Sequence, residues 1–259
     1  TPGTPRKGYG IYSNVNNVLV ENNTFYDCKH AFTTGGSREN IVSGVVFRGN
    51  TVHELPIRAF NTDQLSDASD YTGSIDAHAG VLGIFEIAAN VIYAHGRAFY
   101  IRNGMANIYG NSVYQITNPI DILGTDEHQI DYINFHENYV ELLDSETSCI
   151  WNGYNSVGSQ PGVVSNLSIN RNIIKNGSIV LLNSIKFSIN GISISNNSIS
   201  NAGSGIKVHT TNTLNVLVRN VTIKENEIIL KNGSASSNVG VSLSGGSNNT
   251  RTATFDRII

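Results

Sequence analysis

The chain alternates apolar and polar residues in short runs with a period of two, which is the pattern of half-buried β-strands. The stretch 74–111 contains two successive passes of one unit: a strand, a turn, a second strand and a closing asparagine. Alternation sends Ile75 and Ala77 to one side of the first strand, and Asp76 and His78 to the other. If the passes are stacked coils, their polar residues meet on one outer surface.

A closing asparagine followed by a small or aliphatic residue and then an apolar one recurs along the chain. The instances are Asn23, Asn50, Asn90, Asn111, Asn138, Asn172, Asn197 and Asn226, with spacings of 27, 40, 21, 27, 34, 25 and 29 residues. Asparagine suits this position because its short side chain tolerates left-handed backbone and bonds to backbone nearby. Stacked asparagines also bond to one another as amide ladders, so we expect such a ladder here.

These spacings predict an all-β fold, a right-handed parallel β-helix (solenoid) of about eight to nine coils with loop insertions. The chain lacks the Leu-x-x-Leu-x-Leu pattern of leucine-rich repeats and the even period of a propeller. We expect residues 1–259 to form one domain. The longest interval contains residues 53–73, a polar and acidic segment that we interpret as an inserted loop with a short helix. Since the chain begins without Met, we interpret it as a fragment of a longer protein.

Composition and charge narrow the function. The 259 residues are 39% hydrophobic and 14% charged, with a net charge of −3. Nucleic-acid binding depends on clustered Lys and Arg, so no nucleic-acid partner is expected. No apolar run approaches the roughly 18 residues that indicate a membrane span.

A second strand register precedes each closing asparagine, and its polar positions define the candidate site. The residue after each inward apolar one is Tyr12, Thr33, Asp76, Tyr100, Asp121 or Trp151, and His78 and Arg102 follow two positions further on. Acids beside aromatic rings suit a carbohydrate, because the rings pack on sugar faces and the acids handle protons. We assign Asp76, Asp121, His78 and Arg102 as catalytic, and Tyr100, Trp151, His30, Thr33 and Asn103 as substrate-binding. The alternative is an outer face that is only solvated.

Three segments carry a family resemblance: 30–36 (HAFTTGG), 75–80 (IDAHAG) and 101–104 (IRNG). They resemble the central coils of pectate-lyase-superfamily β-helices in phage tailspikes and tail appendages, of the polysaccharide depolymerase type. The middle segment resembles the Asp-Thr-His-x-Gly element of that superfamily, with Ala77 in place of Thr. The resemblance covers roughly residues 10–140. It implies an extracellular, homotrimeric virion-tail protein that degrades or binds a bacterial surface polysaccharide or teichoic acid.

Two reactions compete with simple binding at this site. In hydrolysis, Asp76 and Asp121 would lie two coils apart, about 9.6 Å along the stack at the usual strand spacing. That distance is near the upper edge of the roughly 6.5–9.5 Å between an inverting pair of carboxyl groups. In elimination from a uronate, Arg102 or His78 would be near the base position. We favour hydrolysis, with a polysaccharide lyase and a non-catalytic adhesin as alternatives.

No cofactor is expected, and calcium is the one ion left open. The acidic residues Asp63, Asp67 and Asp70 have no spacing that matches a known calcium loop. A solvated acidic loop is therefore the preferred interpretation of this segment.

Overall fold

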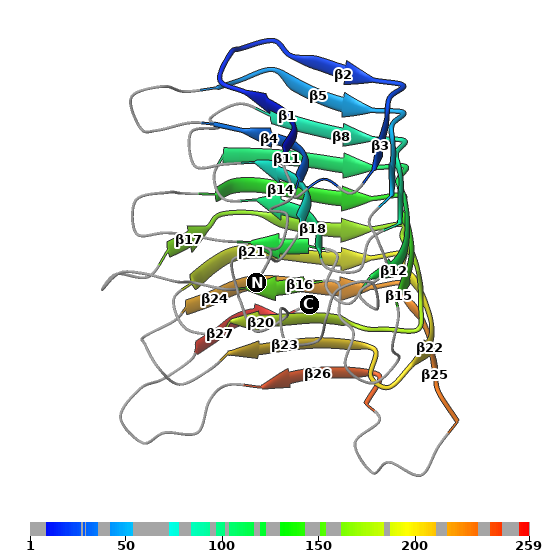
Figure 1. Ribbon diagram of the computed structural model, residues 1–259. Helices are drawn as coiled ribbons and strands as arrows, with labels where there is room; N and C mark the ends of the chain where they lie inside the picture. The colour runs from blue at the N-terminus through cyan, green and yellow to red at the C-terminus, as the bar shows by residue number, and fades with distance from the viewer. Residues whose placement is uncertain are drawn as a thin grey trace, which may run out of the picture.

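The computed structural model is a solenoid of stacked parallel strands (Figure 1). It describes residues 9–26, 28, 30–35, 42–53, 73–77, 84–93, 97–101, 104–116, 120–122, 130–142, 151–153, 162–183, 187–210, 217–232, 239–244 and 254–258. Every recorded strand pair is parallel, which confirms the predicted right-handed parallel β-helix. Most of the predicted loop 53–73 lies outside the described residues, which resume at Gly73.

The strands form four parallel sheets. Sheet 1 contains β1 (Tyr9–Ser13), β4 (His30–Thr34), β7 (Gly73–Ala77), β10 (Arg97–Ile101), β13 (Ile120–Ile122) and β16 (Trp151–Gly153). Sheet 2 contains β2 (Leu19–Glu21), β5 (Val45–Arg48), β8 (Ile84–Ala88), β11 (Gly104–Tyr109), β14 (Ile130–His136), β17 (Gly162–Val164), β18 (Leu167–Asn170), β21 (Phe187–Ser195), β24 (Leu217–Lys224) and β27 (Thr254–Ile258). Sheet 3 contains β3 (Thr24–Tyr26), β6 (Thr51–His53), β9 (Val91–Tyr93), β12 (Ser112–Ile116), β15 (Tyr139–Leu142), β19 (Ile173–Lys175), β22 (Ser198–Ala202) and β25 (Glu227–Leu230). Sheet 4 contains β20 (Ile179–Asn183), β23 (Ile206–Thr210) and β26 (Val241–Ser244).

Each coil takes one strand from each side of the solenoid in turn. Sheet 4 continues sheet 1, because β20 packs against β16. Sheet 2 has ten strands, of which β17 and β18 pair with the same strand β14 and belong to one coil. The described residues therefore contain nine coils, the last of them represented by β26 and β27. This agrees with the eight to nine predicted from the asparagine spacing.

The interior is a single cluster of buried apolar side chains that runs along the axis. Phe32 lies between Phe47 and Phe85, with ring centroids 5.8 and 5.7 Å away. A second aromatic contact joins Phe99 and Phe135 at 6.3 Å. Most other inward positions hold Ile or Val, because β-branched side chains fit the pleated surface. Full burial of each such side chain contributes about 1.5–3 kcal/mol, and this core is what fixes the register of the coils.

The eight closing asparagines form the expected ladder where sheet 2 turns into sheet 3. The Nδ2 amide of Asn90 donates to Oδ1 of Asn111 at 2.9 Å, and Asn111 donates in the same way to Asn138 at 2.9 Å. Equivalent bonds join every neighbouring pair from Asn23 to Asn226. Since six of the eight are buried to about 1% exposure, these bonds also satisfy amides that water does not reach.

The conformational reason that we expected for asparagine at this position is wrong. Left-handed backbone falls one residue before each ladder asparagine, at Asn22, Gly49, Ala89, Gly110, Glu137, Arg171, Asn196 and Glu225. Asparagine is needed at the ladder position for the hydrogen bonds of its side chain. The side-chain amide donates to the ladder asparagine of the next coil and to a backbone carbonyl of the coil before. Asn111 Nδ2, for example, donates to Ile87 O at 3.0 Å.

Candidate functional site

The outer row of sheet 1 aligns the predicted site residues. The strand register pairs Tyr12 with Thr33, Thr33 with Asp76, Asp76 with Tyr100, and Tyr100 with Asp121. This order confirms the alignment predicted for these five positions. Their roles in binding or chemistry stay predictions.

The predicted position of Trp151 in this row is wrong. Trp151 pairs with Ile120, and Asn152 pairs with Asp121. The row therefore continues into Asn152, and Trp151 stands at the register position of the inward apolar residues. A shift of register by one residue moves a side chain to the other face of a strand. Strand β16 has three residues, which is too short for the alternation of apolar and polar positions to define its register.

His30 lies beside Asp76, with Nε2 3.7 Å from Oδ2. Ala31 and Phe32 both belong to the hydrophobic core, so strict alternation is broken after His30. This break brings His30 to the same side as Asp76, although the two stand at different positions along their strands. The imidazole stacks on Tyr9 at 5.4 Å and 11°, and meets Tyr100 edge-on at 6.3 Å and 75°.

This part of the row is buried, which corrects the expectation of an open polar surface. Asp76 is 2% exposed, Thr33 3% and Tyr100 6%. Burial of a carboxyl group is costly unless it has polar partners, and His30 is one such neighbour. Among the candidate residues, Asp76 and His30 are thus held together in a site from which water is largely excluded.

The side chains of five predicted site residues are not among those that the structure describes. His78, Arg102 and Asn103 lie outside the described residues. Asp121 and Trp151 are described only through the backbone of β13 and β16, so their side chains add nothing to the geometry.

Within the described part of the chain, no group of three His, Cys, Asp or Glu residues is arranged to hold a metal ion. Residues Asp63, Asp67 and Asp70 are outside that part. Among the residues that the structure describes, no helix is long and apolar enough to cross a membrane.

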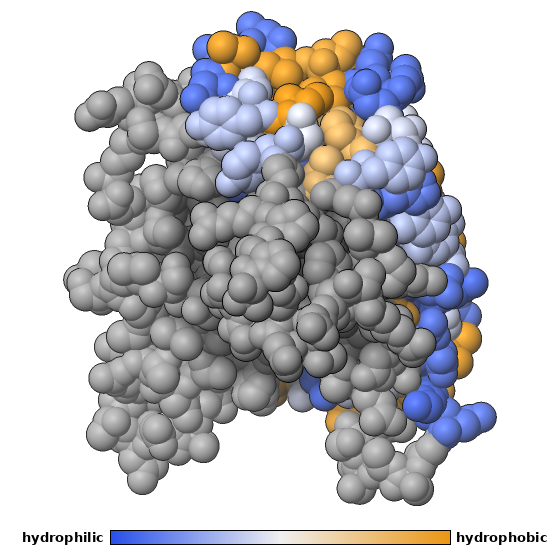
Figure 2. Space-filling model, in the orientation of Figure 1, coloured by the Kyte–Doolittle hydropathy of each residue, from blue (hydrophilic) through white to orange (hydrophobic). Residues whose placement is uncertain are grey.

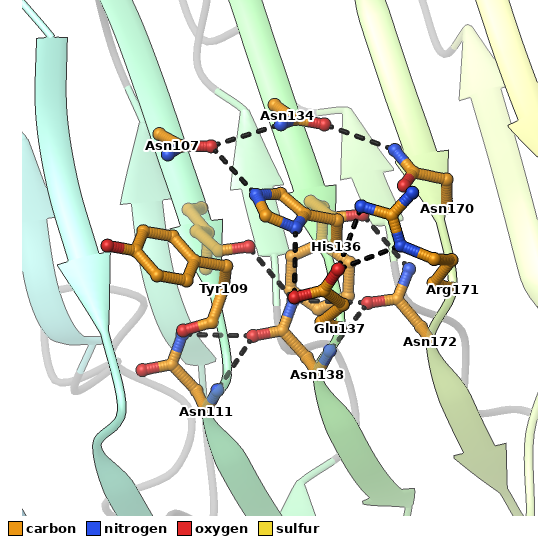
Figure 3. Close-up of polar contacts among 12 residues, drawn as sticks. Asn107, Tyr109, Asn111, Asn134, His136, Glu137, Asn138, Asn170, Arg171 and Asn172 are labelled. Carbon is orange, nitrogen blue, oxygen red and sulfur yellow. Dashed lines mark hydrogen bonds and ion pairs between the residues drawn. The ribbon is translucent and has the colours of Figure 1, made fainter.

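A second polar network, which the sequence analysis missed, covers the outer face of sheet 2 (Figure 3). Asn134 Nδ2 donates to Asn107 Oδ1 at 3.1 Å, and Asn170 Nδ2 donates to Asn134 Oδ1 at 3.2 Å. His136 Nε2 lies 3.2 Å from the same Asn107 oxygen. An amide oxygen only accepts, so a hydrogen bond between these two atoms requires a proton on Nε2 of His136. A signal was available: Asn107 and Asn134 each stand four residues before a ladder asparagine.

The ionisable groups of this network act on one another. Nδ1 of His136 is buried without a hydrogen-bond partner and lies 3.8 Å from a carboxylate oxygen of Glu137. Burial lowers the pKa of the His136 imidazole below its ordinary value. Tyr109 stacks on His136 at 5.1 Å and donates to Glu86 at 2.8 Å, and this hydrogen bond raises the pKa of Tyr109. Arg171 forms a 2.8 Å ion pair with Glu137. The network therefore ties four coils together across their outer surface.

Sheet 3 carries a third feature, a stack of aromatic rings on successive coils. His53 lies between Tyr26 and Tyr93, with both centroids 5.1 Å away and the planes within 7°. The stack continues through Tyr114 at 5.2 Å to Tyr139, which is tilted by 49°. The nearly parallel rings cover one another's faces, so this stack contributes chiefly to the stability of the solenoid.

Fold and outer row together define a class of protein: a right-handed parallel β-helix with a buried Asp–His pair on one sheet. A comparison with family models, with curated proteins and with solved structures found no match.

Proposed function

We propose that this chain is part of an extracellular virion-tail depolymerase that hydrolyses a bacterial surface polysaccharide or teichoic acid on the outer face of sheet 1. The observation that carries the proposal is the register of Asp76, Tyr100 and Asp121 on three successive strands. This register supports two aspartates in one row, and His30 lies beside the first of them.

The chemistry follows from the spacing of the two acids. Two strand separations amount to about 9.6 Å, near the roughly 6.5–9.5 Å at which an inverting pair of carboxyl groups leaves room for a water molecule. One carboxyl group would protonate the glycosidic oxygen while the other activates water on the opposite face of the sugar. His30 would orient Asp76. Exclusion of water from such a site strengthens each of these interactions.

A second candidate is a non-catalytic glycan-binding adhesin or spike domain. The burial of Asp76 and Thr33 favours it, because a carboxyl group that is 2% exposed is poorly placed to meet a substrate unless the site opens. A polysaccharide lyase rests on Arg102 and His78, which lie outside the described residues.

Incubation of the purified protein with capsular polysaccharide and teichoic acid from host bacteria tests the proposal. Hydrolysis of glycosidic bonds predicts new reducing ends, and their loss in Asp76→Asn and Asp121→Asn. Release of products that carry an unsaturated sugar would identify a lyase. Binding with no release by the wild-type protein would identify the adhesin and contradict the hydrolase proposal.

We further propose that the chain assembles as a homotrimer, as the resemblance to tailspike β-helices implies. Large apolar side chains gather on the first coil, where Val15 is 63% and Leu19 53% exposed (Figure 2). Apolar groups of this size are stabilised when another surface covers them, which supports contact with further protein.

A further inference from the structure

Two tyrosines of β1, the first strand of sheet 1, are exposed to solvent, whereas Tyr100 on β10 is buried. Tyr9 is 52% and Tyr12 is 58% exposed, whereas Tyr100 is 6% exposed. The rings of Tyr9 and Tyr12 lie 6.2 Å apart at an interplanar angle of 41°. Two tilted rings at this distance present apolar surface to a ligand instead of covering one another, in contrast to the parallel rings of sheet 3.

Tyr9 is connected to the candidate site through His30. Its ring stacks on the imidazole at 5.4 Å, and that imidazole adjoins Asp76 at 3.7 Å. The stack fixes the orientation of the Tyr9 ring. Because the ring is ordered in advance, the Tyr9 side chain loses less conformational entropy when a ligand binds there.

The Tyr12 ring occupies space that is open because Gly35 has no side chain. A Cβ added to Gly35 would overlap the hydroxyl group and ring of Tyr12 and the amide oxygen of Asn14. The φ angle of Gly35 lies outside the left-handed region, so glycine is needed here for space and not for backbone conformation. The Gly35 amide donates to Ser13 O at 2.9 Å, which fixes this position against the coil that carries Tyr12.

We propose that Tyr9 and Tyr12 form a binding subsite for the pyranose ring of a neutral sugar unit. The C–H face of a pyranose packs on an aromatic ring, and the phenol and the Asn14 amide offer hydrogen-bond partners to its hydroxyl groups. Asp76 adjoins His30, on which Tyr9 stacks, and a carboxylate in that position would disfavour an acidic sugar. That this sugar belongs to the polysaccharide acted on at Asp76 rests on the proposed function, whereas sugar binding itself does not.

Saturation-transfer NMR with the methyl pyranosides of glucose, galactose, mannose and N-acetylglucosamine tests the subsite without any cleavage. We expect transfer to at least one of them, and roughly tenfold weaker binding in Tyr12→Ala. Tyr12→Phe should retain most of the binding, since it keeps the ring. The matched control is Tyr26→Ala, which removes a tyrosine of comparable exposure (66%) from sheet 3 and should leave binding unchanged.

Gly35→Ala gives a second test that leaves both tyrosines in the chain. The added methyl group displaces the Tyr12 ring, so binding should weaken as in Tyr12→Ala while circular dichroism stays that of a β-helix. Transfer to none of the four sugars, or transfer that survives both Tyr12→Ala and Gly35→Ala, overturns the subsite. Cleavage assays report separately on the proposed function: sugar binding without cleavage would contradict the hydrolase and support the subsite.

Discussion

The side-chain amide of Asn111 donates to Oδ1 of Asn138 at 2.9 Å, and the backbone N–H of Asn111 donates to the same oxygen at 3.0 Å. One residue thus connects its coil to the next through two hydrogen bonds. It also accepts two from Asn90 in the coil before. Because the side chain is 1% exposed, each bond satisfies a group that water cannot reach.

Asn111→Ala should therefore destabilise the solenoid by about 2–3 kcal/mol, since it removes the acceptor of the Asn90 backbone N–H and side-chain amide. It also removes the Nδ2 donor from Ile87 O and Asn138 Oδ1. Chemical denaturation followed by circular dichroism measures this loss. The control is Asn23→Ala at the exposed end of the ladder, where we expect a change within about 0.5 kcal/mol. Equal effects at the two positions would contradict the role of burial.

Asp76→Asn should abolish polysaccharide cleavage while the protein remains folded. The substitution keeps the shape of the side chain and removes its ability to exchange a proton, which general acid–base catalysis requires. Reducing-end assays measure cleavage, and thermal unfolding checks the fold. Asp131→Asn, on the exposed surface of sheet 2, is the control and should retain full activity. Unchanged turnover in Asp76→Asn would remove Asp76 from the catalytic set.

The reaction should be hydrolysis with inversion at the anomeric carbon, because the spacing of Asp76 and Asp121 leaves room for water. Proton NMR of the first products distinguishes the anomers before they equilibrate. Retention of configuration would contradict the two-strand spacing as the catalytic distance. Absorbance from an unsaturated sugar in the products would contradict hydrolysis and identify the reaction as elimination.

His136 should make the protein less stable as the pH falls. Its pKa in the folded state is lowered below 6.5, chiefly by burial, so the unfolded chain binds the proton more tightly. The contribution of His136 to stability is therefore complete above pH 6.5 and is lost as the pH falls through its folded-state pKa. Denaturation at several pH values compares the wild type with His136→Gln, whose pH dependence should be weaker over this window. Parallel curves for the two proteins would exclude His136 as the cause.

Light scattering at low micromolar concentration should give the mass of three chains. The exposed apolar side chains on the first coil supply a surface that association would cover. Leu19→Asp should weaken assembly, whereas Ile173→Asp on sheet 3 serves as a comparison at similar exposure. A stable monomer with full activity would contradict the trimer.

The sequence was sufficient for the fold because each coil repeats the same local chemistry. The period of two identifies the strands, and the spacing of asparagines such as Asn90 and Asn111 counts the coils. Parallel stacking of equal repeats then determines which residues become neighbours. For this reason Asp76, Tyr100 and Asp121 could be aligned from sequence, although the 40-residue interval before Asn90 gives no register of its own.

The tertiary structure alone decided which of those neighbours meet and which are accessible. Alternation assigns a residue to one side of a strand, but exposure depends on what packs over that side, so the burial of Asp76 and Tyr100 could not be deduced. The contact between His30 and Asp76 arises from a break in alternation at Ala31 that no local pattern encodes. The exposed position of Tyr12 depends on the space left by Gly35 in the next coil, a relationship that exists only once the coils are stacked.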